Sequence, residues 1–358
     1  MPKNKKTIIA LLLIPQYFLI KLLSNNPEFV ETYYSHGLYP FISKIFRYVL
    51  GWLPFSFGDF IYAFAIIYAV RWLYKNRKRL RKDTKQWLVD VVAVLSIFYF
   101  AFHALWGLNY YRLPLHKNLN LNHDYTTEQL VLVTKKLIEK SNGYHLKITD
   151  NDTVRVAVPY SKSEIFKRTQ NGYDHLKETF PHLEYHPKSV KKSLFSYPLT
   201  YMGFSGYLNP LTNEAQVDAL IPVYKFPTTT AHEIAHQLGY AAENEANFIG
   251  FLATINNDDI YFKYSGYTFG LRFCLNEIYR RDEALYETIV ADVNIGILKN
   301  YEEVRLFWEA HQNPTEPLFK LFYGNFLKVN NQSKGMESYN YVVALLVNYF
   351  EDASLQQC

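Results

Sequence analysis

The segment TTTAHEIAHQLGYAAENEANFIG, residues 228–250, sets two histidines and three glutamates in an otherwise apolar run. On a helix, His232 and His236 share one face a single turn apart, so both imidazoles can bind one zinc ion. Glu233 lies beside them, placed to take a proton from the water that attacks a substrate. The spacing predicts a helix with a zinc-centred active site, and a polar face on an ordinary helix is the competing interpretation.

The start of this helix decides what Glu233 can do. Thr230 and Glu233 have the spacing of a capping box, which would turn the glutamate back toward the helix start. Pro227 favours the other interpretation, because proline is preferred at the first helical position. We therefore expect the helix to begin near Phe226 or Pro227, with Glu233 well inside it.

A break after the second histidine is needed to complete the site. An uninterrupted helix would carry Glu243 about 10 Å along the axis from His236, too far to share a metal ion. Gly239 is suited to end the first helix in a left-handed conformation, after which a second helix can begin. The turn then returns Glu243 as the third ligand, with Glu245 as the next candidate. We expect Asn247 and Glu245 in the second coordination shell.

The first 110 residues contain most of the long apolar stretches, although aromatic residues make up 17% of the whole chain. Residues 7–24, 55–74 and 87–108 approach the roughly 20 residues that cross a bilayer as a helix. The first stretch resembles a signal peptide but lacks a small-residue cleavage site, so we interpret it as an uncleaved anchor. The sequence predicts a membrane region over 1–110 and an extracytoplasmic domain over 111–358.

Basic residues set the expected orientation. Lys3, Lys5 and Lys6 precede the first apolar stretch, and seven Lys or Arg residues lie between 75 and 85. The positive-inside rule places both clusters in the cytoplasm, so three crossings put the later residues on the periplasmic side. The net charge of +5 is accounted for in this way, and we expect the lipid bilayer rather than nucleic acid as a partner.

Other residues give weaker signals. Residues 28–54 mix apolar and charged residues at spacings that fit a helix lying on the membrane surface. We expect Asp59 at the membrane interface and His103 packed within the helix bundle. Cys274 and Cys358 are far apart, so we expect neither a disulfide framework nor a cysteine metal site.

The later part of the chain predicts an α+β arrangement, with a small sheet followed by helices. Strand patterns occur at 153–159, at 188–196 and in a hairpin that joins 200–208 to 213–220. A capping signature at Thr126 opens one helix, and 161–180 has the pattern of another. Further helices are expected at 227–239, 243–256, 259–280, 283–298, 301–312, 316–329 and 337–350.

His232-Glu233-x-x-His236 followed by Glu243-x-x-Ala246-Asn247 resembles the gluzincin metallopeptidases, in which two histidines and a glutamate from the next helix bind zinc. The order of parts also resembles a bacterial family of zincin-like membrane proteins without an assigned function, over nearly the whole chain. The resemblance implies a zincin-like domain with Glu233 as catalytic base. The chain departs from the gluzincin pattern in its short gap before Glu243 and in Asn247, where aspartate is usual.

We therefore expect an integral membrane zinc metallopeptidase that cuts an envelope protein or peptide. Cleavage inside the membrane is a second hypothesis, disfavoured because 228–256 is too polar for a membrane span. A non-catalytic protein with structural zinc is a third, disfavoured because structural sites usually have four protein ligands, often cysteine.

The substrate is less well defined by the sequence. The short linker 109–122 after the third span predicts cleavage near the outer membrane face, and peptidoglycan cross-link peptides stay open as substrates. Residues 213–220 are interpreted as an edge strand that pairs with an extended peptide, or as a plain structural hairpin. Tyr339, His311 and Tyr240 are the candidates for stabilising an oxyanion.

Overall fold

The computed structural model describes residues 3–332 and 341–352, and it is mostly helical with one small sheet. Three segments are long and apolar enough to cross a membrane: Asn4–Ser24, formed by α1 (Lys3–Leu11) and α2 (Leu13–Ser24), α5 (Phe57–Asn76) and α7 (Thr84–Leu105). They agree with the three predicted stretches. The third ends at Leu105 rather than 108, because the chain turns at Trp106 into a short 3-10 helix, η2 (Gly107–Tyr111).

The segment between the first two apolar helices is helical, as expected, and one of its faces packs on the globular part. It comprises α3 (Pro27–Phe29), the π-helix η1 (Val30–Leu38) and α4 (Tyr39–Leu50). Tyr39 donates to the Gln237 carbonyl at 2.8 Å, and Ser43 donates to the Asn213 side chain at 2.8 Å. The opposite face of α4 exposes Phe41, Ile45, Tyr48 and Val49. Such an amphipathic helix fits the membrane surface, and its location there stays a prediction.

A buried ion pair joins this segment to the chain after α7. Two guanidinium nitrogens of Arg112 donate to the two Glu31 oxygens at 2.7 and 2.9 Å. The side chains are only 4% and 9% exposed. Burial acts to raise the pKa of Glu31, but Arg112 outweighs it and holds that pKa below its usual range. Arg112 also donates to the Gly239 carbonyl at 3.0 Å, so the pair supports the turn next to the predicted metal ligands.

Removing one partner of this pair is expected to be costly. Glu31→Gln leaves the Arg112 charge buried without its counter-ion, which should lower the free energy of unfolding by about 3–5 kcal/mol. The measurement is denaturant unfolding of the full chain in detergent. Glu184→Gln is the matched control, because the Lys44–Glu184 pair is 45% and 48% exposed. It should change stability by about 0–1 kcal/mol, and equal shifts in both variants would contradict this account.

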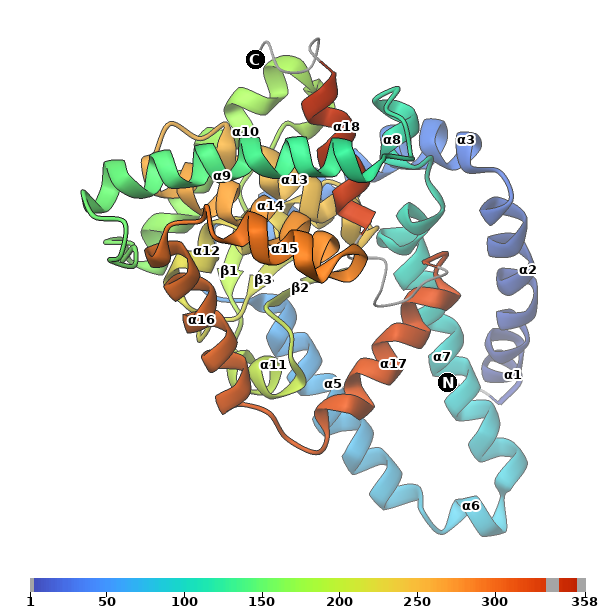
Figure 1. Cartoon of the computed structure of the whole chain (residues 1–358). Coiled ribbons are helices and arrows are strands. Elements are labelled where there is room, and N and C mark those ends of the chain that lie inside the picture. Colours follow the sequence, from blue (N-terminus) through green and yellow to red (C-terminus); the bar gives the residue numbers. More distant parts are fainter. Residues whose placement is uncertain (1–2, 333–340, 353–358) are drawn as a thin grey trace.

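The core is built by long helices that cross one another. They are α9 (Thr127–Thr149), α13 (Glu243–Ile255) and α14 (Ile260–Arg281), whose buried apolar side chains share one cluster. The capping box predicted at Thr126 is present at the start of α9. In Figure 1 these helices lie together, while α5 and α7 extend away from them toward α6 (Arg79–Lys82). The part of the chain between Arg112 and α12 also contains α8 (Leu115–Asn118), α10 (Lys162–Thr179), η3 (Pro181–Leu183), α11 (Ser196–Met202) and η4 (Val223–Lys225).

The sheet has three short strands in the order β1 (Val190–Lys192), β3 (Glu214–Val217), β2 (Gly206–Asn209). β1 is parallel to β3, and β2 is antiparallel to it. The prediction that 213–220 forms an edge strand is wrong, since β3 is paired on both sides. The edge strand of the hairpin is β2.

The strand predicted at 153–159 is also wrong. That segment starts with a turn and a bend and then has no regular secondary structure; its Val156 amide donates to the Asn300 side chain at 3.0 Å, and the Asn300 amide donates back to the Val156 carbonyl at 3.1 Å. An asparagine side chain from α16 (Ile295–Ala310) therefore occupies the place of a neighbouring strand.

The C-terminal helices follow the prediction with shifted boundaries. The expected helices at 283–298 and 301–312 are α15 (Glu283–Val290) and α16, because the chain breaks near Asn294, whose amide donates to the Asn142 side chain at 3.0 Å. α17 (Glu316–Val329) has the expected bounds, and α18 spans Val342–Glu351. Part of the helix expected at 337–350 lies outside the described residues.

Candidate metal centre

α12 (Phe226–Gln237) begins at the predicted place, with Pro227 in its first turn. The capping-box interpretation is wrong. Thr230 lies inside the helix and donates to the Phe226 carbonyl at 2.7 Å, and Glu233 lies further along the same helix. His232, Glu233 and His236 therefore project from consecutive turns of one regular helix.

The turn after α12 takes the form that the glycine predicts. Gly239 has a φ of +92°, and the Tyr240 amide donates to the Ala235 carbonyl at 3.1 Å. The Tyr240 carbonyl is 2.7 Å from His236 Nδ1, so the same turn fixes the tautomer and orientation of that imidazole, with Nδ1 as the donor. α13 then begins at Glu243 and runs back past α12.

Glu243 meets the two histidines as predicted. Its Oε2 lies 3.3 Å from His232 Nε2 and 3.5 Å from His236 Nε2. Burial acts to raise the pKa of Glu243, but the two histidines outweigh it and hold that pKa well below its usual range. A negative carboxylate between two imidazole nitrogens is the result.

A tyrosine from a distant helix orients this carboxylate. The Tyr323 hydroxyl of α17 donates to Glu243 Oε1 at 2.5 Å, which leaves Oε2 turned toward the histidines. Trp106 supports α12 in a similar way, because its indole donates to the backbone carbonyl of His236 at 2.9 Å. Sequence reasoning missed both residues, since neither belongs to a motif and each lies more than 70 positions from its partner.

Glu233 lies in a different environment from Glu243. It is buried, and burial raises the pKa of its carboxyl to about 8. On one side it abuts Gly206 of β2, where an added Cβ would lie 2.6 Å from Glu233 Oε1. Its Oε2 has no hydrogen-bond partner among the described residues.

These residues fit a metal ion by their chemistry. Two imidazoles and one glutamate are the protein ligands of a known class of catalytic zinc sites, which keep a further position open. Donor atoms of His232, Glu233 and His236 lie within 4.8 Å of one another, the one such cluster in the part of the chain that the structure describes. The buried Glu233 Oε2 beside these donors, which has no hydrogen-bond partner among the described residues, is the expected environment for a cation.

The cluster lines a cavity of about 1170 Å³. The lining residues come from α5, α7, α11, β2, α12, α13, α14 and α17, so apolar helices and globular helices both contribute. Asn247 lines this cavity, as expected for a residue of the second shell, and its side-chain nitrogen has no hydrogen-bond partner among the described residues.

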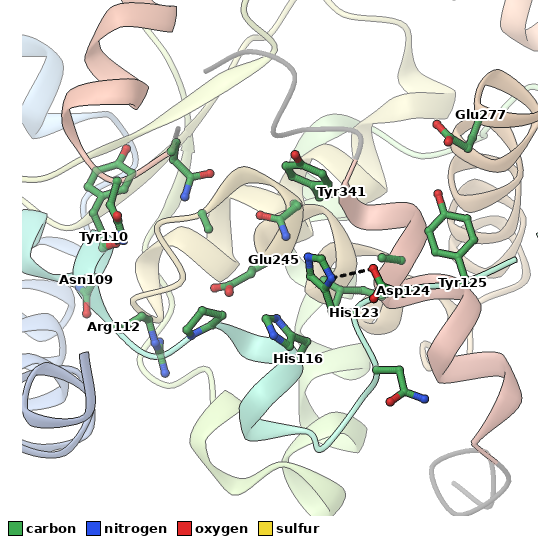
Figure 2. A pocket seen from close by; sticks show the side chains of 18 of the residues that line it. Asn109, Tyr110, Arg112, His116, His123, Asp124, Tyr125, Glu245, Glu277 and Tyr341 are labelled. Carbon is green, nitrogen blue, oxygen red and sulfur yellow. Dashed lines mark hydrogen bonds and ion pairs between the residues drawn. The ribbon is translucent and has the colours of Figure 1, made fainter. Parts of the chain in front are cut away.

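Glu245, in contrast, does not reach the histidines. Figure 2 shows it in a second cavity of about 570 Å³, near Arg112, His116 and His123. Its carboxylate accepts a hydrogen bond of 2.7 Å from the Leu115 amide. Two residues along α13 from Glu243, its side chain points to another face of the helix. The expectation that Glu245 supports the metal site, or serves as its third ligand, is therefore corrected.

Comparison with known proteins identifies a family but not an activity. Residues 34–347 match a family described as "Protein of unknown function (DUF3810)". The chain belongs to this family. No curated protein and no solved structure matches it. The matched range of this DUF3810 protein includes α5, α7 and the whole metal cluster, so the function has to be argued from the site.

Two of the three candidates for oxyanion stabilisation, His311 and Tyr240, are not brought to the cavity. His311 Nδ1 donates to the Phe307 carbonyl at 2.7 Å, and the Tyr240 ring lies under the Arg112 guanidinium at 4.1 Å. Neither lines the metal cavity, and Tyr339 lies outside the described residues. Lys225 does line it, donating to the Ser205 hydroxyl at 2.7 Å, and burial lowers its pKa to about 7.

Two ionisable residues near the spans have structural contacts. Asp59 accepts hydrogen bonds from the Leu194 amide at 2.6 Å and from the Tyr207 hydroxyl, so it ties the start of α5 to the hairpin. It is fully buried within the protein in the first turn of α5, and its expected place at the membrane interface stays a prediction. His103 packs among aromatic rings within α7 and donates to the Tyr99 carbonyl at 2.9 Å, as expected.

Proposed function

We propose that this protein is a membrane-anchored, zinc-dependent metallopeptidase of the gluzincin-like kind. The observation that carries the proposal is the meeting of His232, His236 and Glu243 at one carboxylate oxygen, with Glu233 beside them in a large cavity. A structural zinc site would need no cavity and no spare buried carboxylate. α12 and α13 are not among the three helices long and apolar enough to cross a membrane, which favours a site outside the bilayer over cleavage within it.

The residues have separate roles in the proposed reaction. His232, His236 and Glu243 would hold zinc, which when bound supplies a Lewis acid that polarises the scissile carbonyl. Glu233 takes a proton from water as its oxygen attacks the carbonyl carbon. The same carboxyl then gives the proton to the amide nitrogen as the C–N bond breaks, yielding a carboxylic acid and an amine, which exchange a proton to become a carboxylate and an ammonium group. Tyr323 is a positioning residue that keeps Glu243 turned toward the histidines.

We infer that a peptide binds in extended form along β2, rather than along 213–220 as the sequence suggested. β2 is paired only with β3 among the described strands, and its residues Gly206, Tyr207 and Leu208 line the cavity. A free strand edge offers main-chain hydrogen bonds to an extended chain. The contact between Gly206 and Glu233 brings this edge next to the catalytic base.

Gly206→Ala tests this geometry. The added methyl group would lie 2.6 Å from both Glu233 Oε1 and the Gln216 backbone oxygen of β3, so it would displace the glutamate and disturb the β2–β3 pair. A shift of about 1 Å in a catalytic group can cost about 100-fold in rate. We expect kcat/KM to fall to that extent with zinc content unchanged. Gly143→Ala is the control, because an added Cβ there meets nothing within 4 Å. Wild-type kcat/KM in Gly206→Ala would exclude the proposed approach along β2.

We also propose that the N-terminus and α6 face the cytoplasm and that the site faces the periplasm. Lys6 and Arg79 both contact the Asp90 carboxylate, at 2.7 and 3.0 Å, so the two basic clusters meet at one end of the apolar helices. This supports one cytoplasmic side for both clusters. In Figure 1 α6 lies at the far end of α5 and α7 from α12 and α13.

The function is tested with the full chain in lipid nanodiscs, because Trp106 and the segment before α5 contact the site. A mixed-sequence peptide library is incubated with the protein and the products are identified by mass spectrometry. We expect hydrolysis of internal peptide bonds, its loss on chelation and its return on adding zinc. A protein that holds stoichiometric zinc and cuts no peptide would favour the structural-zinc hypothesis.

A further inference from the structure

One end of the metal cavity is formed by the apolar helices. Tyr62, Ala65 and Ile66 of α5 line it together with Phe102 of α7 and Phe326 of α17. In Figure 1 α17 lies between α5 and α7, and the Phe102 and Phe326 rings are 5.9 Å apart. Ile66 lines the cavity and is nevertheless 60% exposed, so the cavity reaches the outer surface of a helix that could span the membrane.

The cavity lining also contains polar and basic side chains. Arg272 and Asn276 of α14 line the cavity and are exposed to solvent, together with Phe269 and Phe273 of the same helix. Lys225 lines it as well and lies within electrostatic reach of both Arg272 and Glu233.

The candidate metal residues line the same cavity as the apolar helices and α14. From His236 a series of ring contacts reaches the apolar end: Trp106 lies 6.1 Å from His236, Phe102 lies 6.0 Å from Trp106, and Phe326 follows. Lys225, within electrostatic reach of Glu233, belongs to the polar and basic part of the lining. A molecule that contacts both parts of the lining across the candidate metal site must have an apolar part and a polar part.

We propose that the substrate is a lipid-anchored peptide, whose acyl chain occupies the apolar end while its peptide part pairs with β2. This rests on the proposed peptidase function and names its substrate class. Water adds across a peptide bond close to the acylated residue, leaving a carboxylate on one product and an amine on the other. The acyl chain enters from the bilayer past Ile66.

The size of the cavity favours an acyl chain over a transmembrane helix as the anchor. A helix is about 10 Å across, so a helix in this cavity would occupy much of the space between the apolar helices and β2. A slender acyl chain leaves room there for an extended peptide, and burial of its CH₂ groups favours binding.

The first test maps binding without requiring hydrolysis. Full-length Glu233→Gln protein in phosphatidylglycerol nanodiscs is mixed with short mixed-sequence peptides that carry a palmitoyl chain with a terminal diazirine, and then irradiated. We expect adducts on Ile66, Phe102 or Phe326 that are competed by unlabelled palmitoyl peptide and not by the same peptide without the chain. Adducts spread over lipid-facing residues such as Ile67, insensitive to the competitor, would overturn the proposal.

The second test uses the zinc-loaded wild-type protein with three forms of the same peptide: free, palmitoylated, or extended by an apolar helix of about 20 residues. We expect kcat/KM for the palmitoylated form to exceed both others by at least about tenfold. Equal rates for the free and palmitoylated forms, or a faster helical form, would overturn this inference and leave the peptidase function standing. No hydrolysis of any form would instead contradict the peptidase function.

A pair of variants ties the preference to the cavity. Ala65 lines the apolar end, whereas Ala69, one turn further along α5, does not. Ala65→Trp should remove the preference for the palmitoylated peptide while hydrolysis of the free peptide continues. Ala69→Trp should keep the preference. An unchanged preference in Ala65→Trp would show that the chain binds elsewhere and would overturn the proposal.

Discussion

Replacing Glu233 with glutamine is expected to lower kcat/KM for peptide hydrolysis by about 10²–10⁴-fold, the usual contribution of a general base. Glutamine has nearly the same shape but cannot accept the proton that water must lose. The side chain sits beside the histidines and has an unpartnered oxygen, so the change removes the base without opening the fold. Because Glu233 is not one of the three proposed ligands, zinc should stay bound.

The measurement pairs kcat/KM on a peptide identified from the library with zinc content per chain. Glu184→Gln, which changes a glutamate of an exposed ion pair, is the control and should retain wild-type activity. Hydrolysis at the wild-type rate by zinc-loaded Glu233→Gln would exclude this residue as the base.

Glu243→Gln is expected to act on zinc itself. Loss of a residue that only supports a ligand typically costs about 10–100-fold in metal affinity, so loss of the one charged ligand should cost more than about 100-fold. Glu243 is the carboxylate that faces both imidazoles, and Tyr323 holds it in that orientation. Activity should fall with the zinc content and return in part when excess zinc is supplied.

The affinity is measured by competition with a chelating dye on the full chain. Glu245→Gln makes the comparison sharp, because this glutamate lies only two residues away but accepts its hydrogen bond from Leu115 in the second cavity. The Glu245→Gln variant should bind zinc as tightly as the wild type does. Weak zinc binding in Glu245→Gln together with normal binding in Glu243→Gln would reverse the ligand assignment.

The helix–turn–helix that carries the site could be predicted because its signals are local. Pro227 fixes the start of α12, and Gly239 adopts the positive φ that ends it. Once these two points are set, the lengths of the flanking helices bring Glu243 to His232 and His236. The three apolar helices were predictable for a similar reason, since length and composition alone define them.

Contacts between distant parts of the chain were not predictable. β3 lies in the middle of the sheet because it pairs with β1 as well as with β2, and β1 is separated from the hairpin in the sequence by α11. The sequence around Val156 has the pattern of a strand, but the Asn300 side chain forms the hydrogen bonds with the Val156 amide and carbonyl. Tyr323 orients Glu243 only because α17 packs beside α7, and nothing near residue 323 in the sequence indicates that.

Glu245 shows the limit of spacing arguments at the site itself. Both Glu243 and Glu245 lie in the first turn of α13, and the turn after Gly239 could have presented either one to the histidines. The choice is made by contacts outside the motif: Tyr323 holds Glu243 on one side, and the Leu115 amide holds Glu245 on the other.

The central claim, a zinc site made by His232, His236 and Glu243, is tested most directly by the metal content of the full chain. The protein is purified without chelators, equilibrated with equimolar zinc, desalted and analysed by mass spectrometry of its metals. The account predicts about one zinc per chain, and almost none in a His232→Ala/His236→Ala variant of the same fold. A folded wild-type chain that keeps no more zinc than this variant would contradict it.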